Sequence, residues 1–127
     1  MNKTIGFIGS GNMGGAMIGG IIKAGLTAKE NIYVSDINEE SLARVRESYG
    51  VNTTTDNAQL AKVCDIIVLS VKPFLYPVVI NQIKAVVKED VIIVVIAAGQ
   101  SSEAVAQLFG REIKIVKTMP NTPALVG

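Results

Sequence analysis

Short apolar runs alternate along this chain with longer stretches in which apolar residues recur at helical spacing. The apolar runs predict strands at Thr4–Ile8, Asn31–Asp36, Val51–Thr54, Asp65–Val71, Val91–Ile96 and Glu112–Lys117. The stretches between them predict helices over Met13–Ala24, Glu39–Ser48, Asn57–Val63, the second half of Phe74–Val87, and Ser101–Leu108. Asp65–Val71 and Val91–Ile96 are apolar on both faces, which is typical of parallel strands covered by helices on both sides.

The alternation of strands and helices predicts one α/β domain over residues 1–127. We expect a doubly wound, mainly parallel sheet of about six strands, because the connections have the lengths that right-handed crossovers need. By analogy with other doubly wound sheets, the expected strand order is 3-2-1-4-5-6. Polar and apolar residues alternate in Glu112–Lys117, so this segment is predicted to be an edge strand.

The composition supports a globular domain and excludes several functions. Of the 127 residues, 49% are apolar and 18% charged, and the net charge is +1 with no cluster of Lys and Arg, so nothing indicates nucleic-acid binding. Without histidine, this chain offers no histidine base or metal ligand. Cys64 stands alone and cannot form an internal disulfide, which fits a reducing cytoplasm. The longest apolar run, Val91–Gly99, is too short for the roughly 20 residues of a membrane span, and Ile5–Ile8 is too short for a signal peptide.

A glycine-rich turn follows the first predicted strand and opens the first predicted helix. It contains the pattern G-x-G-x-x-G at Gly9, Gly11 and Gly14, within a strand–helix–strand unit, and this context is typical of dinucleotide-binding domains of the Rossmann type. Gly9 would permit the tight turn, Gly11 the close approach of a pyrophosphate, and Gly14 the packing of helix on strand. The alternative is a glycine-rich turn that serves packing alone.

Asp36 ends the second predicted strand, 22 residues after Gly14. An acidic residue at this place binds the adenosine ribose hydroxyls in NAD-binding domains, and a carboxylate there would repel a 2′-phosphate. The alternative is a turn residue before a helix, a role that suits both Asp36 and Asn38.

The predicted strands end in small residues and prolines at one edge of the sheet. These ends are Ser70–Pro73, Ile96–Gly99 and Thr118–Pro123, and together they favour a cofactor cleft. Asp36 and Lys72 are the only charged residues along that edge, and Lys72 is either a plain surface lysine or a neighbour of the cofactor or of a substrate carboxylate. No acid–base set, metal cluster or activated nucleophile is evident, which suits hydride transfer to a protonated C=N bond.

Four segments in order along the whole chain resemble pyrroline-5-carboxylate reductases. They are FIGSGNMG (7–14), SVKP (70–73), IAAG (96–99) and MPNTPALVG (119–127), of which the last is the most specific. The resemblance implies reduction of 1-pyrroline-5-carboxylate to proline with NADPH or NADH, the last step of proline biosynthesis, in a cytoplasmic homo-oligomeric enzyme. Another NAD(P)-dependent imine, keto-acid or hydroxyacid reductase, or a cofactor-binding fragment without activity, is the alternative.

The resemblance also implies roles for single residues. Those implied to contact the cofactor are Ile8, Gly9, Ser10, Gly11, Asn12 and Met13 at the pyrophosphate, Asp36 at the ribose, Asn57, and Ser70, Val71, Lys72, Pro73, Ile96, Ala97 and Ala98 around the second ribose and nicotinamide. The loop implied to lie at the nicotinamide and substrate is Met119, Pro120, Asn121, Thr122 and Pro123. The family has a C-terminal helical domain that forms the dimer and much of the substrate pocket. We expect this chain to end before it, so no catalytic residue is assigned.

Overall fold

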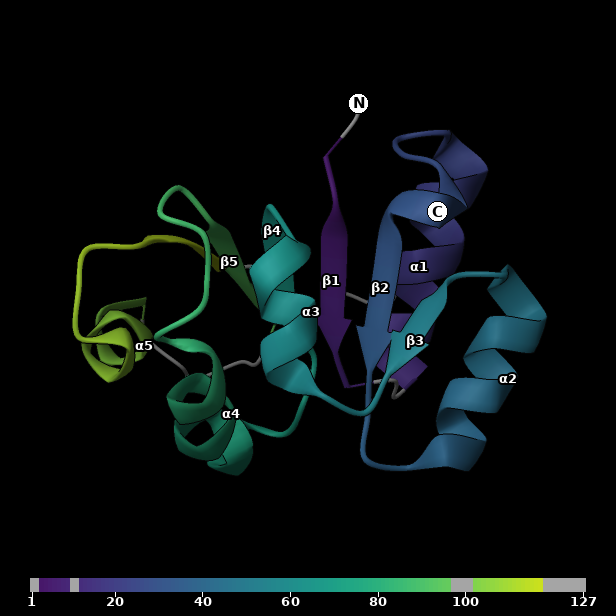
Figure 1. Cartoon of the computed structure of the whole chain (residues 1–127). Coiled ribbons are helices and arrows are strands. Elements are labelled where there is room, and N and C mark those ends of the chain that lie inside the picture. The colour runs from purple at the N-terminus through teal and green to yellow at the C-terminus, as the bar shows by residue number, and fades with distance from the viewer. Residues whose placement is uncertain (1–2, 10–11, 97–101, 118–127) are drawn as a thin grey trace.

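A parallel sheet forms the centre of the molecule in the computed structural model, which describes residues 3–9, 12–96 and 102–117 (Figure 1). Its strands are β1 (Ile5–Ile8), β2 (Ile32–Ser35), β3 (Asn52–Thr54), β4 (Ile66–Leu69), β5 (Ile92–Val95) and β6 (Lys114–Lys117). The order is β3-β2-β1-β4-β5-β6, and every neighbouring pair is parallel. The predicted doubly wound fold and its strand order are therefore confirmed.

Helices connect the strands nearly as the sequence pattern predicts. They are α1 (Asn12–Ala24), α2 (Glu39–Tyr49), α3 (Asn57–Val63), α4 (Tyr76–Ile83) and α5 (Ser102–Phe109), with short 3-10 turns η1 (Lys29–Asn31) and η2 (Pro73–Leu75). The prediction for α4 was wrong in its placement, because the helix occupies the middle of Phe74–Val87 and not the second half. Pro77 lies in its first turn, where a missing N–H costs nothing, so the proline starts this helix instead of preventing it.

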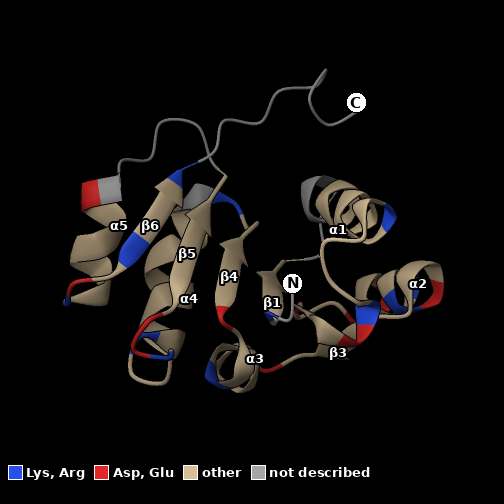
Figure 2. Ribbon diagram, turned by 90° about the horizontal axis from the view of Figure 1, so that it is seen from above, with Lys and Arg blue, Asp and Glu red and all other residues tan. Residues whose placement is uncertain are grey.

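The helices cover both faces of the sheet, α1 and α2 on one side and α3, α4 and α5 on the other (Figure 2). Alternate residues of one strand therefore enter different cores. In β4, Val68 packs on the α1 and α2 side, whereas Ile67 and Leu69 pack on the α3, α4 and α5 side. This explains why the central strands are apolar throughout, as the sequence indicated.

The outer strand β6 contains charged residues, whereas elsewhere the charged residues belong mostly to helices and loops (Figure 2). Lys114 and Lys117 begin and end this strand, and Val116 between them is half exposed. Charged residues on an edge strand disfavour pairing with another chain. The predicted edge position of this segment is thus confirmed.

None of the helices within the described ranges is long and apolar enough to cross a membrane. The longest of them, α1, has 13 residues, well below the roughly 20 that a bilayer requires.

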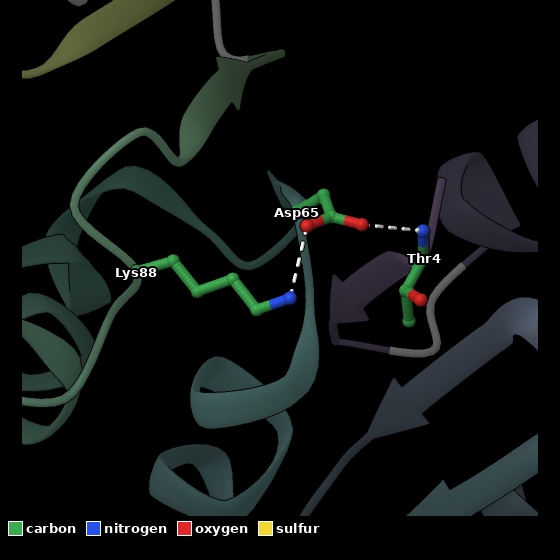
Figure 3. Close-up of polar contacts among 3 residues, drawn as sticks. All are labelled: Thr4, Asp65 and Lys88. Carbon is green, nitrogen blue, oxygen red and sulfur yellow. Dashed lines mark hydrogen bonds and ion pairs between the residues drawn. The ribbon is translucent and has the colours of Figure 1, made fainter. Parts of the chain in front are cut away.

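An acidic side chain joins three segments at the amino end of the sheet (Figure 3). One carboxylate oxygen of Asp65 accepts the backbone N–H of Thr4 at 3.0 Å, and the other lies 2.9 Å from the Lys88 ammonium. These segments lead into β1, β4 and β5. The N–H of Thr4 first, and then Lys88, lower the pKa of Asp65 below its ordinary value.

Cys64, the neighbour of Asp65, is fully buried between α3 and the sheet. Burial first, and the negative charge of Asp65 second, raise the pKa of its thiol to about 12. The thiol is therefore protonated at neutral pH, and Cys64 is a core residue, as the sequence context favoured.

We expect Asp65→Asn to lower the free energy of unfolding by roughly 1 kcal/mol at pH 7, because the amide cannot form the ion pair and accepts the Thr4 N–H more weakly. A carboxyl whose pKa is lowered by folding stabilises the protein above its unfolded pKa, about 4, and this contribution is lost as the pH falls through the folded value. Urea unfolding at several pH values should show the two proteins converging below about pH 4. Glu47→Gln, which alters an exposed carboxylate on α2, is the control, and an equal loss there would contradict the assignment.

The Cys64 thiol is expected to resist alkylation by iodoacetamide in the native protein at pH 8 and to react fully in guanidinium chloride. The reason is the combination of burial and the pKa of about 12. Mass spectrometry of the alkylated chain measures both states. Rapid modification of the folded protein would show that the thiol is accessible.

Candidate functional site

The strand order reverses between β1 and β4, and ligands of doubly wound sheets bind at the carboxyl ends of the strands beside such a reversal. A pocket of about 410 Å³ lies at this place. Its lining comes from the ends of β1, β2 and β4 and from α3, η2 and α4, namely Ile8, Gly9, Ser35, Asp36, Ile37, Asn57, Ser70, Val71, Lys72, Leu75, Val78, Val79 and Gln82. Of the predicted cofactor residues, seven are brought together here: Ile8, Gly9, Asp36, Asn57, Ser70, Val71 and Lys72.

Gly9 has a backbone φ of +102°, which residues with a Cβ rarely adopt. A Cβ at this position would lie 2.9 Å from Val71 Cγ1 and 3.1 Å from the carbonyl of Ser70. The Gly9 N–H donates to the Ser35 carbonyl at 2.8 Å, so β1 turns directly beside the end of β2. The first glycine of the motif thus serves both a tight turn and a close approach of two loops.

Ser70 connects the end of β4 to the same turn. Its hydroxyl donates toward the carbonyl oxygens of Ile8 at 2.9 Å and Gly9 at 2.7 Å, and its N–H also donates to Ile8 at 3.0 Å. The serine therefore holds the two strands at the reversal point in register. We expect this arrangement to keep the pocket floor rigid, because all three bonds lie between backbone segments 62 or 61 residues apart.

The rest of the glycine motif leads into α1. Ser10 and Gly11 lie outside the described residues, and Asn12 and Met13 are the first two residues of α1. Because α1 follows the carboxyl end of β1, its first N–H groups lie at the same edge as the pocket. Strand, turn and helix thus occur in the order that a pyrophosphate-binding turn requires.

Asp36 lines the pocket and also forms the turn that the sequence allowed as its alternative role. Its Oδ1 accepts the N–H of Asn38 at 2.9 Å, and its own N–H donates to the Thr54 carbonyl at 3.2 Å. Asn38 in turn caps α2 by accepting the N–H groups of Glu40 and Ser41. The turn and a place beside a ligand are therefore compatible.

A chain of polar side chains crosses the pocket wall from β2 to α4. The buried Ser35 hydroxyl donates to Asn57 Oδ1 at 2.6 Å, and Asn57 Nδ2 donates to Gln82 Oε1 at 2.7 Å. These bonds point the amide nitrogen of Asn57 away from Ser35. Sequence reasoning missed Ser35 and Gln82, although Gln82 follows Val78 and Val79 at the helical spacing that places all three on one face.

Apolar side chains that are exposed form the outer part of the pocket. Ile37 is 92% exposed, Val78 56% and Leu75 37%. An apolar wall open to solvent suits a flat ring such as adenine. The sequence pattern did not single out these residues.

Other predicted site residues lie elsewhere. Ile96 is buried in the core on the α1 and α2 side and does not line the pocket. Pro73 begins η2, and the Lys72 carbonyl accepts the N–H of Leu75 at 2.9 Å within this turn. Ala97, Ala98, Met119, Pro120, Asn121, Thr122 and Pro123 lie outside the described residues.

A larger hollow, of about 890 Å³, lies at the opposite end of the sheet, where β5 and β6 begin. It is lined by charged residues of loops such as Glu89, Asp90 and Arg111. Because ligands of this fold bind at the carboxyl ends of the strands, the smaller pocket is the better candidate. Within the described ranges no three acidic or cysteine side chains gather as a metal site would require.

The strand order and the strand–turn–helix unit at its reversal point define a Rossmann-type dinucleotide-binding fold. Residues 4–99 match the family described as NADP oxidoreductase, coenzyme F420-dependent, and the chain belongs to this family.

The chain is also similar to pyrroline-5-carboxylate reductases. It is 38% identical to the enzyme of Escherichia coli (strain K12) over 99% of this chain and 47% of that protein. The solved reductase from Coxiella burnetii superposes with a TM-score of 0.92 at 33% identity, covering 99% of this chain and 47% of that one. The Plasmodium falciparum reductase, solved with NADP bound, has a TM-score of 0.83 at 35% identity over 98% and 45%. The resemblance inferred from the motifs is thus confirmed, and the chain spans about half the length of these relatives.

Gly9→Ala should destabilise the protein by about 2 kcal/mol or more, since the new Cβ meets both a positive φ and the Ser70–Val71 segment. Gly25→Ala is the matched control, because Gly25 also has positive φ but no atom within 4 Å of its Cβ position. It should cost only about 1 kcal/mol. Urea denaturation of both variants measures the difference, and equal losses would refute the close approach.

Proposed function

We propose that this chain is the NAD(P)H-binding domain of a pyrroline-5-carboxylate reductase. The observation that carries the proposal is the pocket at the strand-order reversal, in a chain similar to such reductases over nearly its whole length. The enzyme would catalyse the last step of proline biosynthesis. We place it in the cytoplasm, because the buried free thiol of Cys64 fits a reducing compartment.

The described residues fit a dinucleotide lying along the carboxyl edge of the sheet. The turn at Gly9 and the start of α1 suit the pyrophosphate, because backbone can approach closely there and the helix N-terminus attracts negative charge. The apolar wall of Ile37, Leu75 and Val78 suits the adenine ring. Asn57, whose amide is oriented by Ser35 and Gln82, suits a hydrogen bond to the cofactor through the second hydrogen of its Nδ2.

For the nicotinamide end of the site, the proposal follows the resemblance seen in the sequence motifs. Ser70–Pro73 and Ile96–Ala98 would flank the ribose and ring, and Met119–Pro123 would lie between the nicotinamide and the substrate. Ser70 supports this order, because it positions the backbone between β1 and β4 where the two halves of the cofactor would join.

When bound, the nicotinamide would supply a hydride to the carbon of the protonated C=N bond in 1-pyrroline-5-carboxylate, which would give proline. This chain would hold the ring and exclude water from one side. Among the described residues that line the pocket, only Asp36 and Lys72 are charged, so orientation is the main contribution of this chain.

The second candidate is a cofactor-binding domain that catalyses nothing alone. It is favoured by the fact that the chain spans about half the length of its relatives, so that further residues contacting the substrate would lie in the other half of those proteins. We propose that the whole protein is a homo-oligomer held together mainly by that half. The isolated chain would then be monomeric or weakly associated, which light scattering measures.

The 127-residue chain should bind NADH or NADPH with a dissociation constant of roughly 1 μM to 1 mM, the usual range for enzyme ligands. Quenching of dinucleotide fluorescence or calorimetry measures it, with GTP as a control nucleotide. Failure of a folded sample to bind either dinucleotide would refute the cofactor site.

Turnover separates the two candidates. The whole protein should oxidise NAD(P)H in the presence of 1-pyrroline-5-carboxylate, whereas the chain alone should bind cofactor without turnover if substrate residues are elsewhere. If the whole protein reduces a keto acid but not this imine, it is a different reductase.

A further inference from the structure

We propose that Ser35 and Gln82 are positioning residues of the pocket, which together fix the side-chain amide of Asn57 so that it presents a hydrogen-bond donor to the ligand. The inference rests on the proposed function and deepens it, because it says how this part of the site recognises a dinucleotide. The group recognised is a hydrogen-bond acceptor of the dinucleotide, either an oxygen or a ring nitrogen. Neither positioning residue has to touch it.

The three residues come from three elements that meet at one wall of the pocket. Ser35 is the last residue of β2, Asn57 is the first residue of α3, and Gln82 is the next to last residue of α4. Helix α3 packs against both β2 and α4, and all three residues line the pocket. The Asn57 amide therefore lies at the pocket wall with one polar neighbour on each side.

The buried hydroxyl of Ser35 sets the direction of this chain of hydrogen bonds. Ser35 is fully buried, and its hydroxyl donates to Asn57 Oδ1 at 2.6 Å, the one acceptor that it has within the described part of the chain. If the amide were turned over, its nitrogen would face the serine, and the hydroxyl hydrogen would have no acceptor among the described residues. A buried donor without a partner is costly, so the amide is held with its oxygen toward Ser35.

Gln82 completes the orientation from the other side. Its Oε1 accepts one hydrogen of Asn57 Nδ2 at 2.7 Å. The nitrogen carries a second hydrogen, which no residue that the structure describes accepts. Because Asn57 is only half-buried, a ligand in the pocket can accept this hydrogen. The wall thus offers a donor whose direction is set in advance, which lowers the entropic cost of binding an acceptor.

A purely structural link between the elements is the competing explanation. Gln82 is exposed, and its hydrogen bond with Asn57 lies at the surface. Such a bond contributes little to the free energy of unfolding, because water can replace either partner. It matters more for binding, where it decides which atom of the amide faces the ligand. The two explanations therefore predict different results for the same substitutions.

Titration of the 127-residue chain with NADH and NADPH tests the role of the two residues. Gln82→Met keeps the length of the side chain but removes the acceptor, and Ser35→Ala removes the donor. Each substitution should weaken binding of both dinucleotides about fivefold, the factor that corresponds to one neutral hydrogen bond. Urea unfolding shows whether each variant is folded.

Gln82→Glu is the conservative variant, because a carboxylate still accepts the Asn57 N–H. It should keep the affinity within about twofold of that of the unaltered chain, measured at about 0.3 M salt so that the added exposed charge is screened. Asn81→Leu is the matched control for Gln82→Met, since Asn81 is an exposed amide on the same helix that does not line the pocket. It should leave the affinity unchanged.

Thr27→Val is the matched control for Ser35→Ala. Thr27 also has a buried hydroxyl, but it donates to the Lys3 carbonyl at 3.2 Å, at the amino end of the sheet. Its loss should lower the free energy of unfolding without changing the affinity for either dinucleotide.

A double-mutant cycle separates positioning from direct contact. In an Asn57→Ala background, Ser35→Ala and Gln82→Met should each change the affinity less than about twofold, because the group that they orient is absent. Losses that add fully to the loss from Asn57→Ala would show that the two residues act on the pocket by another route, and would overturn the proposal.

The side-chain amide signals of Asn57 in the NMR spectrum of the ligand-free chain report its orientation without any dinucleotide. The two hydrogens of Nδ2 should have clearly different chemical shifts in the unaltered chain, because only one of them is hydrogen-bonded. Ser35→Ala and Gln82→Met should bring the two shifts closer together, whereas Gln82→Glu should keep them apart.

The outcomes distinguish this inference from the proposed function. Binding of neither dinucleotide by the folded, unaltered chain overturns the proposed function and the role of the two residues with it. If the unaltered chain binds but Ser35→Ala and Gln82→Met bind as tightly, or leave the Asn57 signals unmoved, the inference alone is overturned. If Ser35→Ala does not fold, the comparison of Gln82→Met with Gln82→Glu decides by itself, because both change an exposed side chain.

Discussion

The close approach of β1 and β4 just past their carboxyl ends is the constraint on which the rest of the molecule depends. Gly9 allows it, because no side chain separates the turn from Val71, and the Ser70 hydroxyl secures it through the carbonyls of Ile8 and Gly9. The sheet reverses its order at this same place. One backbone contact therefore positions both halves of the domain and the pocket between them.

The architecture was predictable because its signals are local and repeated. Strands such as Ile92–Val95 are apolar on both faces only when helices cover both sides of a parallel sheet, and each crossover has one favoured hand. The strand order followed by analogy from this class of fold. The placement of α4 was less predictable, because Pro77 is compatible with either the first turn of a helix or the loop before it.

The candidate site was predictable in part. Gly9, Asp36 and Ser70 stand at strand ends, where sequence position alone indicates proximity. Ser35 and Gln82 were missed, because a buried serine inside a strand and a glutamine on a helix have ordinary roles in most proteins. Their importance comes from Asn57, which accepts from one and donates to the other, and such pairing depends on three elements packed in space.

The contact of Asp65 with Thr4 and Lys88 lies at the end of the sheet away from the pocket. Strands β1 and β4 thus have one end that is tied by charge and another that is shaped for a ligand. Because of this separation, substitutions near Asp65 can change the stability of the domain without changing the residues that line the pocket. Substitutions at the pocket end can therefore change what is bound while the far end retains the fold, which gives the domain room to evolve new preferences.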